Sequence, residues 1–355
     1  MVAVEDSTCV FSNNMVNGSE YLADVASPII KKRDTGNDTV FESYCKSMTF
    51  THNEVTNVTI SDFGDSLFVA NQFGSLKVTD NNFHDINDMF TGFVWHGNVE
   101  GETIFTGNSF VNIPVQTNAF YGNQTDNTRF NFSNNIFDHF AAPNSEYSTS
   151  ILVVNPYSDA GIIPGVNVVY TLTNNSFSYC SYYLIDIQYD QSTITISQSS
   201  FVGNLISTGV SLYGRDSDLY LSELVFDANL HDNPDGCNPG SYVAIDVDLR
   251  GGSVQVKDVN ITAFQGNMNS VFLYGDFTAN IDNILFDSCN NGLISIDLEN
   301  GVATTVKVSR LVAKKNHLSK DPTVPFIGVT ANFPGISVTF DGLEIKMKRA
   351  FKTRR

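Results

Sequence analysis

One sequence phrase recurs along the chain and limits what it can fold into. An apolar residue is followed five positions later by a second apolar residue, usually Phe, and polar residues and turn formers surround both. The phrase returns about every 25 residues, a period typical of repeat architectures in which each unit packs on its neighbours. The pairs are Phe50 and Val55, Val78 and Phe83, Phe105 and Phe110, Phe132 and Phe137, Leu172 and Phe177, Ile196 and Phe201, Leu221 and Phe226, Val256 and Ile261, Ile281 and Phe286, Val306 and Leu311, and Val338 and Leu343.

A second kind of segment lies between these phrases. Stretches such as YLIDIQYD (183–190), YVAIDVDLRGG (242–252) and GLISIDLENG (292–301) alternate apolar and polar residues and end in Gly, Asp or Asn. Period-two alternation closed by turn residues is typical of short β-strands. Two or three strands in each unit, stacked layer on layer, predict an all-β parallel solenoid.

Leucine-rich repeats are the main alternative, because they share the period and the spacing of VTDNNF and TLTNNSF. Such repeats continue from the Asn into a helical segment, whereas this chain continues into another alternating strand. The solenoid is therefore favoured. Asn81, Asn108, Asn135 and Asn175 share one phase of the repeat, and we expect them to stack as a ladder of side-chain amides inside a turn.

The pattern resembles the pectin-lyase-like right-handed parallel β-helix superfamily. In addition, the steps FVGN (201–204), FDAN (226–229) and FQGN (264–267) are similar to the Phe-x-x-Asn repeats of polymorphic outer-membrane proteins. The resemblance implies a single-stranded right-handed parallel β-helix of about 10–11 coils, and right-handed crossovers are the rule between parallel strands. It implies architecture rather than a particular chemistry.

The units and their lengths predict one elongated domain over residues 1–345, followed by a basic tail at 346–355. Extra residues interrupt the units near 141–165, 230–241 and 313–325, after the repeat aromatic and before the next alternating strand. We expect these insertions to emerge along one edge of the solenoid, where long irregular segments are either functional or tolerated drift.

The charge of the chain argues against nucleic acid as a partner. The net charge is −18, and the last ten residues, KMKRAFKTRR, are basic, so the remainder is still more acidic. Such a body repels phosphate backbones and anionic membranes. No apolar run reaches the roughly 18 residues of a membrane span, and residues 1–8 lack the features of a signal peptide. The oligomeric state stays open.

The five cysteines do not settle the redox compartment. Cys180 and Cys289 each follow the repeat aromatic by three residues but lie several layers apart, beyond the reach of a disulfide. We interpret these two as small buried apolar residues.

Catalytic signatures are missing from the sequence. The motifs that would resemble polygalacturonases or pectin methylesterases do not occur, and neither does a phosphate loop, a His-Glu-x-x-His step or a Gly-x-Ser-x-Gly elbow. The stretch HDNPDG (231–236) indicates a turn rather than a calcium loop. We therefore predict no catalytic residue, metal site or cofactor.

The outward positions of the second kind of strand suggest a binding surface. If alternate residues point inward, the others form a strip of carboxylates, guanidiniums and aromatic rings over neighbouring layers. We refer to this surface as the strip, and its candidate residues are Asp186, Asp190, Tyr213, Arg215, Asp246, Asp248, Arg250, Tyr274, Asp276, Asp297 and Glu299, with Gln188, Ser211, Phe272 and Ser295 between them.

Two interpretations of the strip are open. Aromatic faces stack on sugar rings while carboxylates and Arg hydrogen-bond hydroxyl groups, which suits a polysaccharide or glycoconjugate. The alternative is a solvated sheet face with ion pairs. The sequence thus predicts an extracellular or cell- or virion-surface β-helix that acts as a structural or adhesive module and contacts glycans. Its competitor is a polysaccharide lyase, hydrolase or epimerase, in which Asp246 and Asp248 would carry the chemistry.

Overall fold

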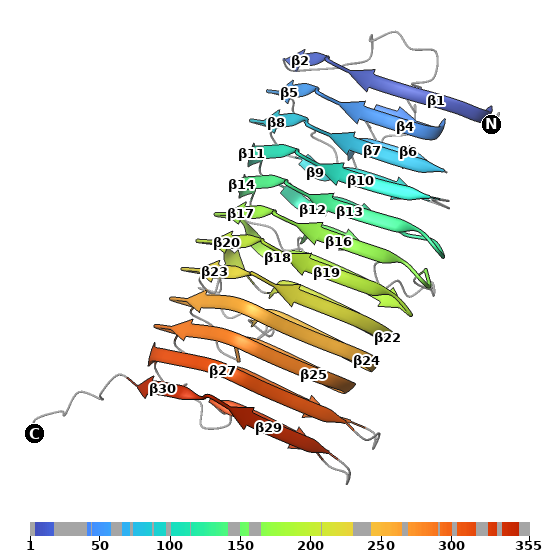
Figure 1. Cartoon of the computed structure of the whole chain (residues 1–355). Coiled ribbons are helices and arrows are strands. Elements are labelled where there is room, and N and C mark those ends of the chain that lie inside the picture. The colour runs from blue at the N-terminus through green and yellow to red at the C-terminus, as the bar shows by residue number, and fades with distance from the viewer. Residues whose placement is uncertain are drawn as a thin grey trace, which may run out of the picture.

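The computed structural model describes the strands of the repeat and the turns between them. The described residues are 4–17, 41–43, 45–57, 66–71, 74–86, 89–96, 101–113, 115–140, 150–155, 165–206, 208–229, 243–264, 269–289, 292–299, 304–316, 326–331 and 336–347. Their strands form one 30-stranded sheet in which successive layers pair in parallel (Figure 1). The part of the chain that is described contains no helix long and apolar enough to cross a membrane. The protein is thus all-β, with a long parallel sheet of the kind found in β-helices and solenoids.

The first face of the stack carries the first member of each repeated pair. Each of its strands pairs with the strand of the same face in the next layer. In order they are β1 (Val4–Ser12), β4 (Cys45–Thr51), β7 (Ser75–Thr79), β10 (Glu102–Thr106), β13 (Arg129–Ser133), β16 (Val169–Thr173), β19 (Thr193–Ser197), β22 (Thr208–Ser222), β24 (Val243–Thr262), β25 (Val271–Asp287), β27 (Thr305–Asn316) and β29 (Ser337–Asp341).

The second face follows each strand of the first face after a tight turn and carries the second member of the pair. Its strands are β2 (Met15–Asn17), β5 (Glu54–Thr56), β8 (Asn82–His84), β11 (Ser109–Ile113), β14 (Ile136–Phe140), β17 (Ser176–Ser178), β20 (Ser200–Val202), β23 (Val225–Asp227), the C-terminal parts of β24, β25 and β27, and β30 (Glu344–Met347).

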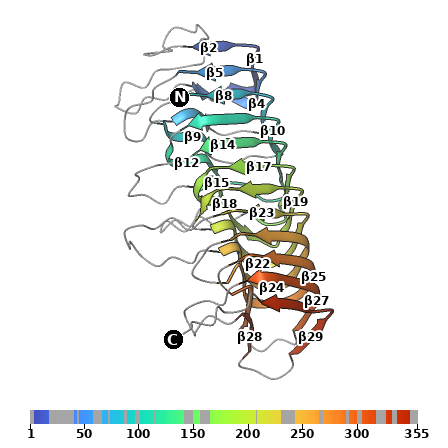
Figure 2. The ribbon, with the colours of Figure 1, turned by 90° about the vertical axis from the view of Figure 1, so that its left-hand side faces the viewer.

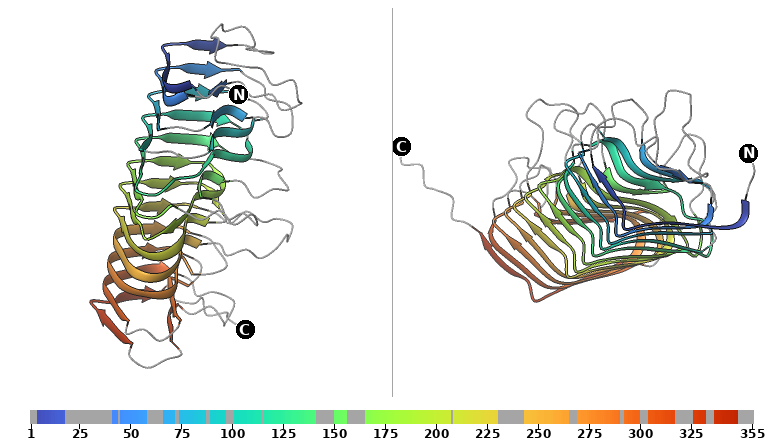
Figure 3. Two further views of the ribbon diagram at one scale, coloured as in Figure 1. Left: turned by 90° about the vertical axis from the view of Figure 1, so that its right-hand side faces the viewer. Right: turned by 90° about the horizontal axis from the view of Figure 1, so that it is seen from above.

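The third face closes each layer, and β9, β12, β15 and β18 lie one below another in it (Figure 2). Seen from above, successive layers repeat a similar outline, each displaced sideways from the one before it (Figure 3). The strands of this face are β3 (Phe41–Ser43), β6 (Ser66–Asn71), β9 (Met89–His96), β12 (Val115–Gly122), β15 (Ser150–Val154), β18 (Ser181–Asp190), β21 (Leu205–Ile206), the N-terminal parts of β22, β24 and β25, β26 (Ile294–Leu298) and β28 (Ile327–Ala331).

The apolar anchors of the repeat form an internal column, as predicted. Ile196 pairs with Leu221, Leu221 with Val256, and Val256 with Ile281, and all four are buried. Within the same core the rings of the second face stack in parallel, with successive centroids between 4.4 and 5.2 Å apart. The stacked rings are Phe83, Phe110, Phe137, Phe177, Phe201 and Phe226.

The predicted phase is wrong in the last units. Ile281 and Phe286 pair with Val308 and Ala313, two residues beyond the predicted Val306 and Leu311. Period-two alternation explains the error, because a shift of two residues leaves the same side of a strand facing inward. At the end of the stack, Phe340 pairs with Val308 and is 41% exposed, so the predicted Val338 does not occupy the anchor column there.

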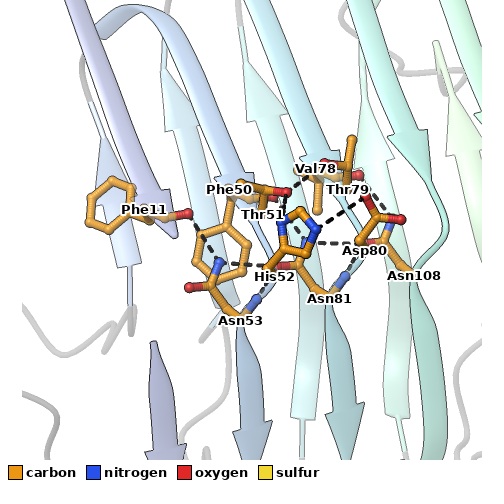
Figure 4. A network of polar contacts seen from close by, with 10 residues as sticks. All are labelled: Phe11, Phe50, Thr51, His52, Asn53, Val78, Thr79, Asp80, Asn81 and Asn108. Carbon is orange, nitrogen blue, oxygen red and sulfur yellow. Dashed lines mark hydrogen bonds and ion pairs between the residues drawn. The ribbon is translucent and has the colours of Figure 1, made fainter. Parts of the chain in front are cut away.

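The amide ladder is present and starts two layers earlier than predicted, at Asn14, whose Nδ2 donates to Asn53 Oδ1 at 2.9 Å. Figure 4 shows the part of the ladder from Asn53 to Asn108. Each Nδ2 donates to the Oδ1 of the next Asn at 2.9–3.1 Å, through Asn81, Asn108 and Asn135 to Asn175. From Asn53 onward each Nδ2 also donates to a main-chain carbonyl one layer back, such as that of Phe50 or Phe105. The ladder thus satisfies main-chain groups at a buried turn.

A second set of Asn residues lies after the stacked rings. Asn204 and Asn229, from the FVGN and FDAN steps, donate to the carbonyls of Phe177 and Phe201. The FQGN step does not share this phase, because Phe264 follows Ile261 by three residues and so takes the place that Asn229 has after Phe226. The similarity of the three four-residue steps did not show that FQGN lies three residues later in its unit than FVGN and FDAN lie in theirs.

Two of the cysteines are buried free thiols, and another two form a disulfide that the sequence did not predict. Cys180 and Cys289 are buried, as expected. Cys9 in β1 and Cys45 in β4 are bonded, with their Cα atoms 6.0 Å apart. Cys237 lies outside the described residues.

Much of each predicted insertion lies outside the described residues, namely 141–149, 156–164, 230–242 and 317–325. The structure defines more closely where two of these insertions begin or end. Ser150–Val154 forms β15 inside the first insertion, and β27 continues to Asn316, so Ala313 to Asn316 belong to the sheet. Lys346 and Met347 of the predicted tail likewise end β30.

Candidate functional site

The strip lies on the third face, and the register of its strands places all eleven candidate residues together. Three outward columns run across β18, β22, β24, β25 and β26. The first column contains Asp186, Ser211, Asp246, Phe272 and Ser295. The second contains Gln188, Tyr213, Asp248, Tyr274 and Asp297. The third contains Asp190, Arg215, Arg250 and Asp276, and it continues to Glu299, whose N–H donates to the carbonyl of Gly275 at 3.1 Å.

Exposure differs between the side chains of the strip. Tyr213, at 46%, Arg215 and Arg250 are exposed, whereas Asp186, Asp246 and Asp248 are partly buried. The exposed aromatic ring and the two guanidiniums thus stand beside a set of carboxylates that water reaches poorly. A solvated face would leave all of these groups open to water.

Burial changes the acidity of the carboxylates. It raises the pKa of Asp186 to about 6, against a hydrogen bond with Ser211 that acts in the opposite direction. Burial also raises the pKa of Asp246 to about 6, and the negative charges of Asp248 and Asp186 add to the rise. The pKa of Asp248 is raised by burial, while Arg250 opposes this shift. Carboxyls in this range exchange protons near neutral pH, which surface carboxylates do not do.

Aromatic side chains continue the strip into β25. The rings of Phe272 and Tyr274 are nearly parallel, at an interplanar angle of 10°, with centroids 6.5 Å apart. Both side chains are partly buried and stand in the outward columns. The phenol of Tyr274 hydrogen-bonds to Glu299, and this bond raises its pKa.

Two glycines in the inward column beneath the strip stand where a Cβ would not fit, and one of them makes room for a buried tyrosine. Tyr189 pairs with Gly214, where a Cβ would meet the tyrosine ring at 2.3 Å. Gly275 has φ +120°, and a Cβ there would meet the Leu249 carbonyl oxygen at 2.1 Å. A side chain at either glycine would displace the strands that hold Tyr213, Asp248 and Tyr274.

Sequence reasoning missed a polar cluster on the second face. His84 Nδ1 lies 3.0 Å from Asp85 Oδ2 and 3.1 Å from the Thr56 hydroxyl, and its Nε2 lies 3.3 Å from Glu54 Oε1. The hydrogen bond with Asp85 is the main reason that the pKa of His84 is raised. Thr56 is 5% exposed and pairs with His84 in the neighbouring strand, so the cluster links two adjacent layers. The scattered positions of these residues in the sequence gave no signal for it.

No metal-binding group of His, Cys, Asp and Glu side chains is found within the described ranges. The chain matches no family model, no curated protein and no solved structure.

Proposed function

We propose that this chain is a right-handed parallel β-helix of about 10–11 coils, similar to the pectin-lyase-like superfamily, that contacts glycans through the strip. It would act outside the cell or on a cell or virion surface as a structural or adhesive module. The observation that carries the proposal is Tyr213, an exposed ring on a strand of the sheet, with carboxylates and guanidiniums in register around it.

The chemistry of that arrangement suits a sugar chain. A tyrosine face stacks on the apolar face of a pyranose ring, and carboxylates and guanidiniums hydrogen-bond its hydroxyls. The strip crosses five neighbouring strands, which at about 4.8 Å per layer spans roughly 20 Å, the length of a short oligosaccharide. Strands also hold these groups more precisely than loops do.

The test compares two exposed tyrosines of the same strand. Tyr213 lies in the strip, whereas Tyr220, 37% exposed, lies in the part of β22 that belongs to the first face. On a glycan array, Tyr213→Ala should lose at least about tenfold in affinity, because a stacking contact contributes about 0.5–1.5 kcal/mol beyond its buried area. Tyr220→Ala should bind like the wild type. Equal binding by both variants would leave the strip as a solvated face.

A second candidate function is cleavage or epimerisation of a polysaccharide in the strip. It is favoured by one observation, the pKa of about 6 of Asp186 and of Asp246, because a general acid or base works best with a pKa near the working pH. Asp246 and Asp248 share one side of β24 and lie about 7 Å apart at two residues' spacing. Assays for reducing ends and unsaturated products would reveal turnover. The Asp246→Asn, Asp248→Asn double variant should abolish it, and full turnover there would exclude this pair.

A further inference from the structure

Two arginines of the strip lie directly opposite each other. Arg215 of β22 pairs with Arg250 of β24, and both side chains are exposed. Neighbouring parallel strands bring such residues about 4.8 Å apart at the backbone. Like charges placed opposite each other on neighbouring strands destabilise a sheet. A role that offsets this cost is therefore expected for the pair.

Neither arginine is neutralised by an ion pair within the described part of the chain. Asp190 and Asp276 flank the two arginines in the same column, and none of the ion pairs between described residues includes Arg215 or Arg250. Arg310 shows the usual arrangement, since it forms a bidentate contact with Asp282. Arg215 and Arg250 thus keep their donors available in a chain with a net charge of −18.

Carboxylates surround the two guanidiniums and limit what fits between them. Asp190 and Asp276 lie one layer away on either side, and Asp248 lies in the neighbouring column. A ligand with one negative group would meet the arginines, whereas charges repeated along a polymer would also meet these carboxylates. Like charges brought together across an interface oppose binding.

We propose that Arg215 and Arg250 together hold one isolated anionic substituent, a carboxylate or a sulfate ester, on an otherwise neutral oligosaccharide. Planar guanidinium groups bind such oxyanions through paired N–H donors. Tyr213, next to Arg215 on the outward side of β22, stacks on the adjacent sugar. This inference rests on the proposed glycan contact and specifies its ligand.

The experiment measures binding of the full chain by calorimetry to four probes. They are a neutral tetrasaccharide, the same tetrasaccharide with one terminal sialic acid, the same with one sulfate ester, and polygalacturonate. We expect at least one singly charged probe to bind tenfold or more tightly than the neutral one, and polygalacturonate to bind less tightly than that probe. The sialylated and sulfated probes distinguish a carboxylate ligand from a sulfate.

Variants separate the arginine pair from the rest of the strip. The Arg215→Gln, Arg250→Gln double variant should bring the ratio of charged to neutral affinity close to one, without lowering the melting temperature. Tyr213→Ala should weaken all bound probes and keep that ratio. Arg129→Gln, an exposed arginine of β13 on the first face, is the matched control and should change neither.

The possible results distinguish failure of the anion site from failure of the glycan contact. Equal affinity for neutral and singly charged probes would overturn the arginine pair as an anion site and leave glycan binding intact. Tightest binding to polygalacturonate, or a charged preference that survives in the double variant, would also overturn it. Failure of all four probes to bind would overturn the glycan contact and the anion site together.

Discussion

The rings of Phe201 and Phe226 lie 4.4 Å apart between centroids, at an interplanar angle of 5°. Both are fully buried, and Phe226 pairs on its other side with Ile261. The contact joins layers that are 25 residues apart in sequence. The stack therefore holds neighbouring repeats together along the axis, as nearest-neighbour contacts do in other repeat proteins.

Removing one ring from this stack should destabilise the protein strongly. Phe226→Ala should lower the free energy of unfolding by about 3–5 kcal/mol, since a large buried side chain leaves a cavity. Urea denaturation followed by circular dichroism measures the loss. Tyr220→Ala, which removes an exposed ring of the first face, serves as control and should change stability by less than about 1 kcal/mol. A loss of that small size for Phe226→Ala would contradict the buried stack.

The amide ladder should be intolerant of shortening. Asn108→Ala would leave the Asn81 side-chain amide and main-chain N–H without their acceptor, and the Val78 carbonyl without its donor. Each buried unpaired group costs about 1–3 kcal/mol, so the midpoint of urea denaturation should fall clearly. Asn280→Ala, at an exposed position of β25, is the matched control. Similar midpoints for the two variants would show that the ladder adds no stability.

Stability should rise as the solution becomes mildly acidic. The pKa values of Asp186 and Asp246 are about 6 in the folded protein, above the usual 3.8, so the folded state binds more protons than the unfolded state between these values. Unfolding free energy therefore increases as the pH falls from 7 through 6 toward 4. Below that window the direction reverses, because Arg310 holds the pKa of Asp282 at about 2 and protonation removes that contact.

Melting temperatures at pH 7.5 and pH 5 check this expectation. The Asp186→Asn, Asp246→Asn double variant should be more stable than the wild type at pH 7.5 and should show a weaker dependence on pH. An unchanged dependence in this variant would assign the effect to other groups.

The buried thiols should resist alkylation in the folded protein. Burial raises the pKa of Cys180 to about 12 and that of Cys289 to about 11, so the reactive thiolate is scarce at pH 8. Mass spectrometry after iodoacetamide treatment should find both residues unmodified in buffer and modified in urea. Modification of either in buffer would contradict its buried position.

Short-range patterns of the sequence determined the main outline of this protein. The recurring apolar pair and the period-two strands predicted a parallel β stack, the core column from Ile196 to Ile281, the amide ladder and the outward alternation of the strip. These features follow from local spacing, because in a stack of layers each residue meets the residue at the same phase of the next unit.

Only the tertiary structure decided those features that depend on the length of individual units or on the surroundings of a side chain. Val308 rather than Val306 pairs with Ile281 in the next layer. The sequence did not show this, because a strand that alternates every two residues has the same pattern after a shift of two residues. The pairing of Cys9 with Cys45 and the contacts of His84 depend on which layers become neighbours. The raised pKa values of Asp186 and Asp246 depend on burial and, for Asp246, on the charges of Asp248 and Asp186, which the sequence of one strand does not reveal.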